Sequence, residues 1–266
     1  MFTPKELDLE RGWPGRIEGD RVVQLAAQTL QSFFTGGGQA REHAEYPLAE
    51  VSLRAPVLHP PAVRDFYSFE QHVRAARALR GLEVPPEWYE QPVFYFSNPA
   101  AIYGPEDEVP YPEGTAELDF ELEVAAIVGL DGQIGGFTVM NDWSARDLQR
   151  AEVKVGLGPA KGKDFATSLG PVVVTPDEFD GSSGTMIARV NSEERSRGEL
   201  GDMRFSWAQL VERAALNTRL LPGDVLGSGT VGTGCILEHG DGRWLQRGDV
   251  VELEVEGIGV LGNTVG

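Results

Sequence analysis

The sequence predicts an α+β protein that is rich in strands and built on an antiparallel or mixed sheet. Two observations support this fold class. The 266 residues include 33 glycines and 17 prolines, which favours short strands joined by loops over a helical bundle. The apolar residues fall mostly into short runs with strand character, and only four stretches are expected to be helical. With 41% apolar and 24% charged residues, the composition is that of an ordinary globular protein.

The first sixty residues are expected to form a small, loosely structured N-terminal region, and residues 61–266 a larger domain. The segment GRIEGDRVVQLA has the pattern of a β-hairpin, and a helix is expected around residues 24–34, closed by the three glycines at 36–38. The proline cluster in AEVSLRAPVLHPPAV marks the expected boundary between the two parts.

A helix and four strands are expected next. In DFYSFEQHVRAARALRGL, apolar residues recur at helical spacing up to Gly81, which predicts a short helix that carries His72. Runs with strand character follow at 92–97, 125–130, 136–142 and 171–176.

The segment SARDLQRAEVK (144–154) predicts a helix with Ser144 or Asp142 available as its N-cap. The last third returns to strands in SSGTMIARVNSEE, VLGSGTVGTG and VVELEVEGIGVLG, with one helix near residues 207–216.

Composition also excludes several classes of function. The formal net charge is −18, from 41 acidic and 23 basic residues, so a nucleic acid would be repelled by most of the surface. No apolar window is long enough to cross a membrane and the N-terminus lacks a signal-peptide core, so we expect a cytoplasmic protein with no membrane association. The single cysteine, Cys235, excludes an intramolecular disulfide and a thiolate metal cluster, so a metal is expected to be held by oxygen or by the four histidines.

Carboxylates at alternate positions precede a buried strand in DFELEVAAIVG (119–129). Side chains two apart share one face of a strand, so Asp119, Glu121 and Glu123 are expected to project together. Their repulsion is tolerated at a solvated strand edge, and it becomes favourable where a hard divalent cation bridges the oxygens. Asp142 in NDWSARD is either a helix cap or a third carboxylate of such a site, which would suit magnesium, manganese or calcium.

The chain has only four lysines, and Lys154, Lys161 and Lys163 lie within ten positions. Two of them occupy the glycine-rich loop LGPAKGKDFATSLGP, which lacks the spacing of a nucleotide P-loop. The crowding is either chance or a need for an ammonium whose pKa can be adjusted, which arginine cannot supply. We interpret the loop as presenting an ammonium to a small anionic substrate. For His72, the alternative is a buried structural histidine.

Together these motifs resemble the fumarylacetoacetate hydrolase family, compact bacterial type. The resemblance rests on ExE, NDWSARDLQ, LGPxxGKxF and SGT with a downstream glutamate, in that order, from about Asp65 to the C-terminus. The segment GRIEGDRVVQL is also similar to the short leader of compact members. The resemblance implies a mixed-sheet β-roll or sandwich, with 61–266 as the catalytic domain.

The resemblance also implies a site. It implies that a Mg²⁺ ion, or Mn²⁺ or Ca²⁺, is held by four carboxylates: Asp65, Glu121, Glu123 and Asp142. It implies three catalytic residues, namely the base His72, its orienting partner Glu238, and Lys163. It implies substrate contacts from Tyr67, Tyr95, Gln149 and Thr230. Asp119 is then no ligand and is expected at a solvated rim, and Lys161 is an ordinary loop residue.

The implied activity is metal-dependent hydrolysis of a C–C bond in a small 1,3-diketo acid such as an acylpyruvate, fumarylpyruvate or fumarylacetoacetate. His72 and Glu238 favour hydrolysis, because a hydrolase needs a base that activates water. The alternatives are an oxaloacetate decarboxylase, a dienedioate isomerase, or a non-enzymatic calcium-binding module. Such a module would need neither His72 nor Lys163. Val153 and Asn98 depart from the family pattern, so the distal end of the substrate is expected to be bound differently. Family members resemble one another in being homodimers, so a homodimer is expected.

Overall fold

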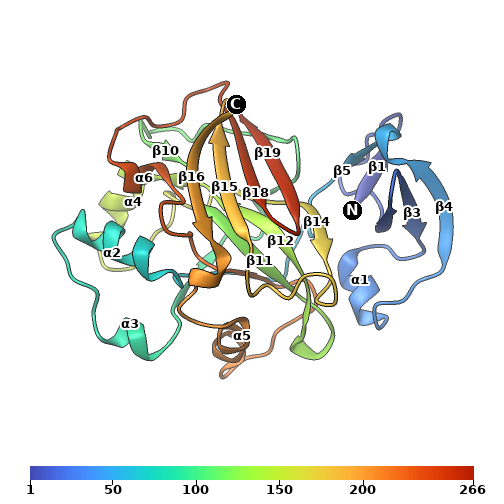
Figure 1. Ribbon diagram of the computed structural model, residues 1–266, viewed down its shortest axis with the longest axis horizontal. Coiled ribbons are helices and arrows are strands. Elements are labelled where there is room, and N and C mark those ends of the chain that lie inside the picture. Colours follow the sequence, from blue (N-terminus) through green and yellow to red (C-terminus); the bar gives the residue numbers. More distant parts are fainter.

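Two mixed sheets packed face to face form the centre of the structure, a computed structural model that describes residues 1–266 (Figure 1). The larger sheet has seven strands, in the order β7 (Phe94–Ser97), β6 (Val63–Phe66), β17 (Val225–Gly227), β11 (Leu122–Val128), β12 (Ile134–Asp142), β14 (Thr167–Val174) and β8 (Ile102–Tyr103). Two neighbouring pairs, β6 with β17 and β8 with β14, run parallel, and the others run antiparallel.

The second sheet has five strands, in the order β16 (Glu193–Glu199), β15 (Thr185–Val190), β18 (Val250–Val255), β19 (Gly259–Val265) and β9 (Glu108–Val109). A separate two-stranded pair joins β10 (Leu118–Asp119) to β13 (Ser144–Ala145). This strand-rich, mixed α+β architecture confirms the predicted fold class.

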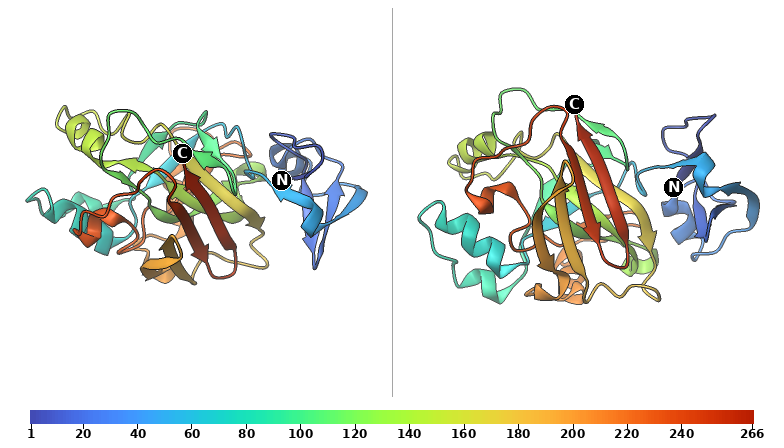
Figure 2. Two further views of the ribbon diagram at one scale, coloured as in Figure 1. Left: turned by 90° about the horizontal axis from the view of Figure 1, so that it is seen from above. Right: turned by 45° about the horizontal axis from the view of Figure 1, so that its top comes forward.

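The N-terminal residues form a small lobe beside the two large sheets (Figures 1 and 2). Its elements are β1 (Phe2–Pro4), β2 (Gly15–Glu18), β3 (Arg21–Leu25), α1 (Leu30–Thr35), β4 (Glu42–Pro47), the 3₁₀ helix η1 (Leu48–Glu50) and β5 (Val51–Leu53). The hairpin of β2 and β3 confirms the prediction for GRIEGDRVVQLA.

The predicted helix over 24–34 was wrong in its start. Residues 22–25 continue strand β3, because Val22, Val23 and Leu25 are buried and the strand pairs with β4. Helix α1 begins only after Thr29, which forms a capping box with Ser32. The region is also more ordered than expected, since a three-stranded sheet runs through it.

The larger lobe carries the remaining helices: α2 (Glu70–Ala78), α3 (Glu87–Glu90), the 3₁₀ helices η2 (Leu130–Gly132) and η3 (Leu200–Asp202), α4 (Arg146–Val153), α5 (Trp207–Ala215) and α6 (Ile236–His239). Helices α2, α3, α4 and α6 gather at the end of this lobe that lies away from the N-terminal lobe (Figure 1). None of the helices has both the length and the apolar composition needed to span a bilayer.

The cap predicted for α4 was wrong. Its N-cap is Ala145, which makes no side-chain cap bond. The Ser144 hydroxyl instead donates to the backbone oxygen of Asp142, and the Asp142 carboxylate accepts bonds from other side chains. Neither residue therefore caps the helix, and the Asp142 carboxylate takes part in the carboxylate cluster instead.

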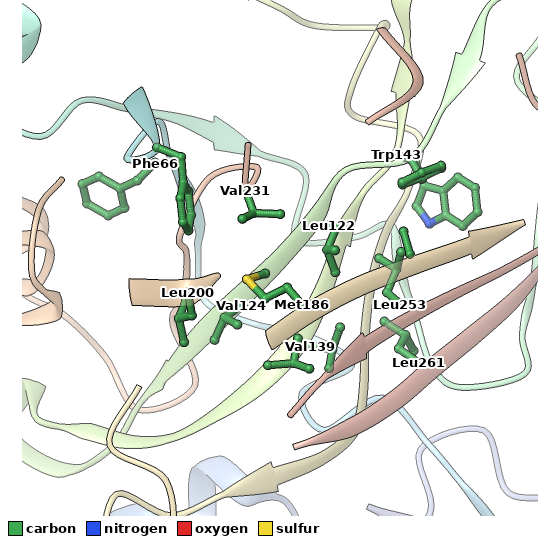
Figure 3. Packing of buried hydrophobic residues seen from close by; sticks show 14 of the residues in the cluster. Phe66, Leu122, Val124, Val139, Trp143, Met186, Leu200, Val231, Leu253 and Leu261 are labelled. Atoms are coloured by element: carbon green, nitrogen blue, oxygen red, sulfur yellow. The ribbon is translucent and has the colours of Figure 1, made fainter. Parts of the chain in front are cut away.

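The main core lies between the two large sheets. Figure 3 shows Leu122 and Val124 of β11 packed among Met186, Leu253 and Leu261 from the second sheet. All seven residues of β11 are buried, so both faces of this strand are covered. Its other face belongs to a second cluster that includes α1 and the linker to the N-terminal lobe. A strand fixed on both faces gives the residues at its end a rigid support.

Candidate active site

Four buried carboxylates converge at one end of the seven-stranded sheet. Alternation along β6, β11 and β12 directs their side chains to the face that carries the second apolar cluster. In the apolar cluster, that face holds Val63, Ala125, Ile127 and Met140. Toward the strand ends, the same face holds Asp65, Glu123 and Asp142. Glu121, just before β11, is the fourth carboxylate of the group. Each of the four offers an oxygen that lies within 4.8 Å of the others. The residues expected to hold a metal are thus brought together.

Lys163 neutralises part of this charge. Its Nζ donates to Glu121 Oε2 at 2.6 Å and to Asp142 Oδ2 at 2.5 Å, and the lysine is buried. The Tyr95 hydroxyl, on the edge strand β7, also donates to Asp142 Oδ2, at 2.6 Å. Lys161 by contrast pairs with Asp164 at the surface, as expected of a loop residue. The two lysines of the loop therefore have different environments.

Backbone and hydroxyl donors hold Glu123. The N–H of Gly229 donates to Glu123 Oε2 at 3.1 Å, and the Thr230 hydroxyl contacts Oε1 at 3.4 Å. Gly229 has φ of +84°, and a Cβ there would lie 2.5 Å from the backbone oxygen of Phe66. The SGT motif thus uses its glycine to bring a backbone donor close to a buried carboxylate.

The carboxylates differ in their pKa. Burial, together with the charge of Asp142, raises the pKa of Asp65 well above its ordinary value. Burial and the neighbouring Asp65 likewise raise the pKa of Glu123. Burial opposes ionisation of Glu121 as well, but the Lys163 ammonium and the Arg146 guanidinium outweigh it and lower the pKa. The cluster therefore combines one stable anion with carboxyls that favour a proton unless a cation replaces it.

The donor set fits a hard divalent cation. All four candidate ligands are carboxylates, which magnesium, manganese and calcium prefer. Two of their oxygens, Asp65 Oδ1 and Asp142 Oδ1, are buried and have no hydrogen-bond partner. A buried, unpaired carboxylate oxygen is costly, and coordination to a cation would satisfy it.

These pKa shifts predict how stability depends on pH. A carboxyl whose pKa is raised by folding stabilises the fold below its unfolded pKa of about 4, and this contribution is lost as the pH rises through the raised value. We therefore expect the thermal midpoint of protein stripped of divalent ions to decrease from about pH 4 toward neutrality, and added Mg²⁺ to restore it.

The variant Glu123→Gln isolates this effect from the other carboxylates of the chain. Because the amide does not ionise, its midpoint should decrease less over the same pH range and should respond less to Mg²⁺. Differential scanning fluorimetry across a pH series measures both. Parallel profiles for the two proteins would contradict the assignment.

Gly227, at the end of β17, leaves room for the carboxylates. A Cβ at this position would lie 2.4 Å from Asp65 Oδ1 and 3.0 Å from Glu123 Oε2. We expect Gly227→Ala to weaken Mg²⁺ binding by about 10- to 100-fold, because it displaces both oxygens. Calorimetric titration measures the affinity. The control is Gly262→Ala in β19, where a Cβ has no neighbour within 4 Å; equal affinities of the two variants would contradict the prediction.

A histidine–glutamate pair lies at the side of the same pocket. His72, on α2, has Nδ1 3.0 Å from Glu238 Oε2 on α6, and both side chains are buried. The carboxylate fixes a proton on Nδ1, which leaves Nε2 as the free base. The Tyr67 ring packs edge-on against the imidazole, with centroids 5.5 Å apart. Burial raises the pKa of Tyr67 to about 12, so its hydroxyl stays a donor.

Asp119 is not at a solvated rim, as the sequence suggested, but fully buried. Its Oδ2 accepts from Arg146 Nε at 2.7 Å, and its two oxygens accept the backbone N–H groups of Ile236 and Leu237 at 2.7 and 3.0 Å. The error came from treating the segment as one strand. Asp119 belongs to β10, which pairs with β13, and the chain leaves strand geometry before β11 begins.

Arg146 was missed by the sequence analysis. Its Nη2 forms an ion pair with Glu121 Oε1 at 2.7 Å, but the angles at this contact are not those of a hydrogen bond. Its Nη1 donates to Gln149 Oε1 at 3.2 Å, which leaves the amide nitrogen of Gln149 available. The signal was present, because a charged residue stands directly after the Ser-Ala of NDWSARD, but only the fold places it opposite Asp119 and Glu121.

A pocket of about 320 Å³ joins these groups. Its lining includes eight of the eleven predicted site residues: Asp65, Tyr67, His72, Tyr95, Glu121, Gln149, Lys163 and Thr230. The other three, Glu123, Asp142 and Glu238, lie directly behind them in contact with lining residues. Val153 also lines the pocket, whereas Asn98 does not and donates to the backbone of Asp164.

Two further arginines line the pocket. Arg150 is paired with Glu117 at 2.6 Å, whereas Arg80 forms none of the ion pairs of the structure. Arg80 is exposed at the pocket wall, in a chain with a net charge of −18. It supplies a site for an anionic group.

Comparison with known proteins identifies relatives of this chain. The chain is 29% identical over 264 residues to the oxaloacetate tautomerase YisK of Bacillus subtilis (strain 168), covering 94% of this chain and 84% of that protein. It is 32% identical over 263 residues to the mitochondrial oxaloacetate tautomerase FAHD2A of Homo sapiens, covering 93% of this chain and 77% of that protein.

Solved structures with the same fold carry different activities in their names. The 5-carboxymethyl-2-hydroxymuconate delta-isomerase of Mycobacterium smegmatis has a TM-score of 0.74 and 29% identity, covering 95% of this chain and 93% of its own. The fumarylacetoacetate hydrolase of Exiguobacterium antarcticum has a TM-score of 0.78 and 28% identity, with 94% of each chain covered. A family model described as "Fumarylacetoacetate (FAA) hydrolase C-terminal" matches residues 62–266. The chain therefore belongs to the fumarylacetoacetate hydrolase family of enzymes.

Proposed function

We propose that this enzyme catalyses proton transfer at an enolisable carbon of a small 2-oxo dicarboxylic acid, as a tautomerase does, with oxaloacetate as the first substrate to test. One observation carries the proposal: the His72–Glu238 pair and the four-carboxylate cluster open into the same pocket. Relatives named as oxaloacetate tautomerases and isomerases support this class over hydrolysis.

Asp65, Glu121, Glu123 and Asp142 would hold the divalent cation. When bound, the cation supplies Lewis acidity that lowers the energy of an enolate. The buried site limits competing water, so charged donors act more strongly there than in solution.

The chain's own residues would move the proton. His72 Nε2 accepts a proton from the carbon next to the keto group, and Glu238 stabilises the imidazolium through Nδ1–H. The same nitrogen then returns the proton to the enolate oxygen. The Gln149 amide and the Tyr67 hydroxyl would donate hydrogen bonds to the substrate, because both line the pocket and both retain a free donor.

A dicarboxylic substrate follows from the charge at the pocket wall. One carboxylate end and the keto oxygen would lie at the cation site, next to Lys163. The second carboxylate would pair with Arg80, which has no acidic partner. The pocket would therefore select a substrate with an anionic group at each end.

Hydrolysis of a C–C bond is the second candidate, because the same His72–Glu238 pair would serve to activate water. The structural likeness to the Exiguobacterium hydrolase supports it. The two reactions differ in their products. Tautomerisation changes only the position of a proton, whereas hydrolysis yields two acids.

The test is a substrate panel with Mg²⁺: oxaloacetate, an acylpyruvate, fumarylpyruvate and fumarylacetoacetate. We expect the enol absorbance of oxaloacetate to decay faster than in a matched enzyme-free sample, with oxaloacetate recovered intact and its C3 protons exchanged in D₂O. Release of pyruvate and carbon dioxide would establish decarboxylation instead, and paired acids from a diketone would establish hydrolysis. No acceleration with any of the four would favour a metal-binding module.

A further inference from the structure

A second set of potential metal ligands lies beside the carboxylate cluster and shares His72 with the pocket. It consists of His72, Cys235 and Glu238, which we call the HCE triplet. His72 Nδ1 lies 3.0 Å from Glu238 Oε2, Cys235 Sγ lies 3.4 Å from the same oxygen, and Sγ and Nδ1 are 3.9 Å apart. All three side chains are buried. One nitrogen, one sulfur and one oxygen therefore point to a common centre.

The three distances fit a zinc ion. A triangle with these edges has a point about 2.0 Å from each corner, and zinc lies about 2.0–2.2 Å from nitrogen or oxygen and about 2.3 Å from sulfur. The ligand atoms would need to move by only a few tenths of an ångström. The single cysteine of the chain excludes a cluster of thiolates, but it leaves a mixed site with one thiolate possible.

The two ligand sets differ in the ions that they favour. The carboxylate cluster offers oxygen alone, which suits magnesium or calcium. The HCE triplet adds imidazole and thiolate, which select zinc or cadmium over magnesium. Excess Mg²⁺ would therefore fill the first site without competing at the second.

We propose that the HCE triplet is an inhibitory site for Zn²⁺. In the free protein the proton of the imidazole lies on Nδ1, next to Glu238, and Nε2 has the lone pair. A zinc ion bound to Nδ1 leaves the neutral ring with its proton on Nε2. Nε2 is then a donor and cannot accept a proton from substrate. The thiol proton of Cys235 goes to solvent, so one proton is released for each zinc bound.

The binding site does not depend on the reaction proposed above, but its effect on turnover rests on the role of His72 in that reaction. The first test therefore measures binding without substrate. Cd²⁺ bound to a thiolate gives an ultraviolet charge-transfer band, and Cys235 is the only cysteine, so any such band reports this residue alone. We expect a band that saturates at one Cd²⁺ per chain in protein kept in excess Mg²⁺.

Two variants test the ligand set. Cys235→Ser should abolish the band, and Glu123→Gln, which alters only the carboxylate cluster, should retain it. Circular dichroism checks that both are folded. Absence of the band in the wild-type protein would overturn the site, as would saturation at a ratio far from one.

The second test measures inhibition by Zn²⁺ in excess Mg²⁺, on whichever substrate the panel identifies. We expect inhibition that more Mg²⁺ does not relieve, and an inhibitory concentration at least about tenfold higher for Cys235→Ser. Inhibition that Mg²⁺ relieves and that is equal in both proteins would place zinc at the carboxylates and overturn the inhibitory role. A Cd²⁺ band in a protein inactive on the whole panel would refute the proposed function and leave the metal site standing.

Discussion

His72→Asn is expected to lower turnover by about 10²- to 10⁴-fold while leaving Mg²⁺ affinity unchanged. Outside the four candidate metal ligands, the imidazole is the pocket side chain that supplies a free base, because Glu238 fixes its other nitrogen. It is not one of the four carboxylates, so the cation site should remain intact. Steady-state kinetics on the substrate from the panel, together with calorimetric titration of Mg²⁺, measures the two effects separately.

A control and an intermediate variant sharpen this prediction. His239→Asn alters an exposed histidine on α6, in the residue next to Glu238, and should leave turnover unchanged. Glu238→Gln keeps an acceptor for Nδ1–H but loses the charge that stabilises the imidazolium. Its activity should therefore lie between that of His72→Asn and that of His239→Asn. Wild-type turnover in His72→Asn would remove the histidine from the mechanism.

Much of the site could be predicted from short-range pattern. The alternation of Glu121 and Glu123 follows from strand geometry, and the helix that carries His72 follows from apolar spacing. The position of Asp65 does not. It reaches the glutamates because β6 pairs in parallel with β17, which in turn pairs with β11, and these pairings join residues about 160 and about 100 positions apart. Only the family resemblance brought Asp65 into the predicted site.

Asp119 shows why the remainder could not be predicted. In a strand, a carboxylate two residues from a metal ligand lies on the same face as that ligand. This holds whether the carboxylate contacts solvent or a buried arginine. Its true partners are Arg146, 27 residues away, and the N-terminus of a four-residue helix more than 110 residues away. Local spacing carries no information about such partners. The prediction assumed one continuous strand, and the break between β10 and β11 removes that assumption.

Asp119 also connects the two halves of the site. On one side it holds Arg146, whose guanidinium reaches Glu121 in the carboxylate cluster. On the other side it accepts the first two backbone N–H groups of α6, the helix that carries Glu238. A movement at Asp119 would therefore displace a carboxylate ligand and the partner of the base together. The charge of Asp119 balances Arg146, which is itself buried.

Replacing Asp119 is thus expected to affect both stability and catalysis. Asp119→Ala leaves a buried guanidinium with one partner fewer and two helix N–H groups without an acceptor, so we expect a loss of about 3–5 kcal/mol in the free energy of unfolding. Asp119→Asn keeps one oxygen for α6 but removes the charge. We expect it to fold, with kcat lowered by about 10- to 100-fold and KM changed much less, because the base is misplaced while the pocket wall remains.

Asp241→Asn is the matched control. Asp241 also binds arginines and a backbone N–H, but at the surface, so its replacement should lower the free energy of unfolding far less than Asp119→Ala and leave kcat unchanged. Chemical denaturation measures the free energy of unfolding of the three variants, and steady-state kinetics measures their kcat and KM. Asp119→Asn could prove as destabilised as Asp119→Ala while its folded fraction keeps the wild-type kcat. In that case Asp119 would stabilise the fold and have no role in catalysis. A lowered kcat at near-native stability instead requires that the buried carboxylate positions the base.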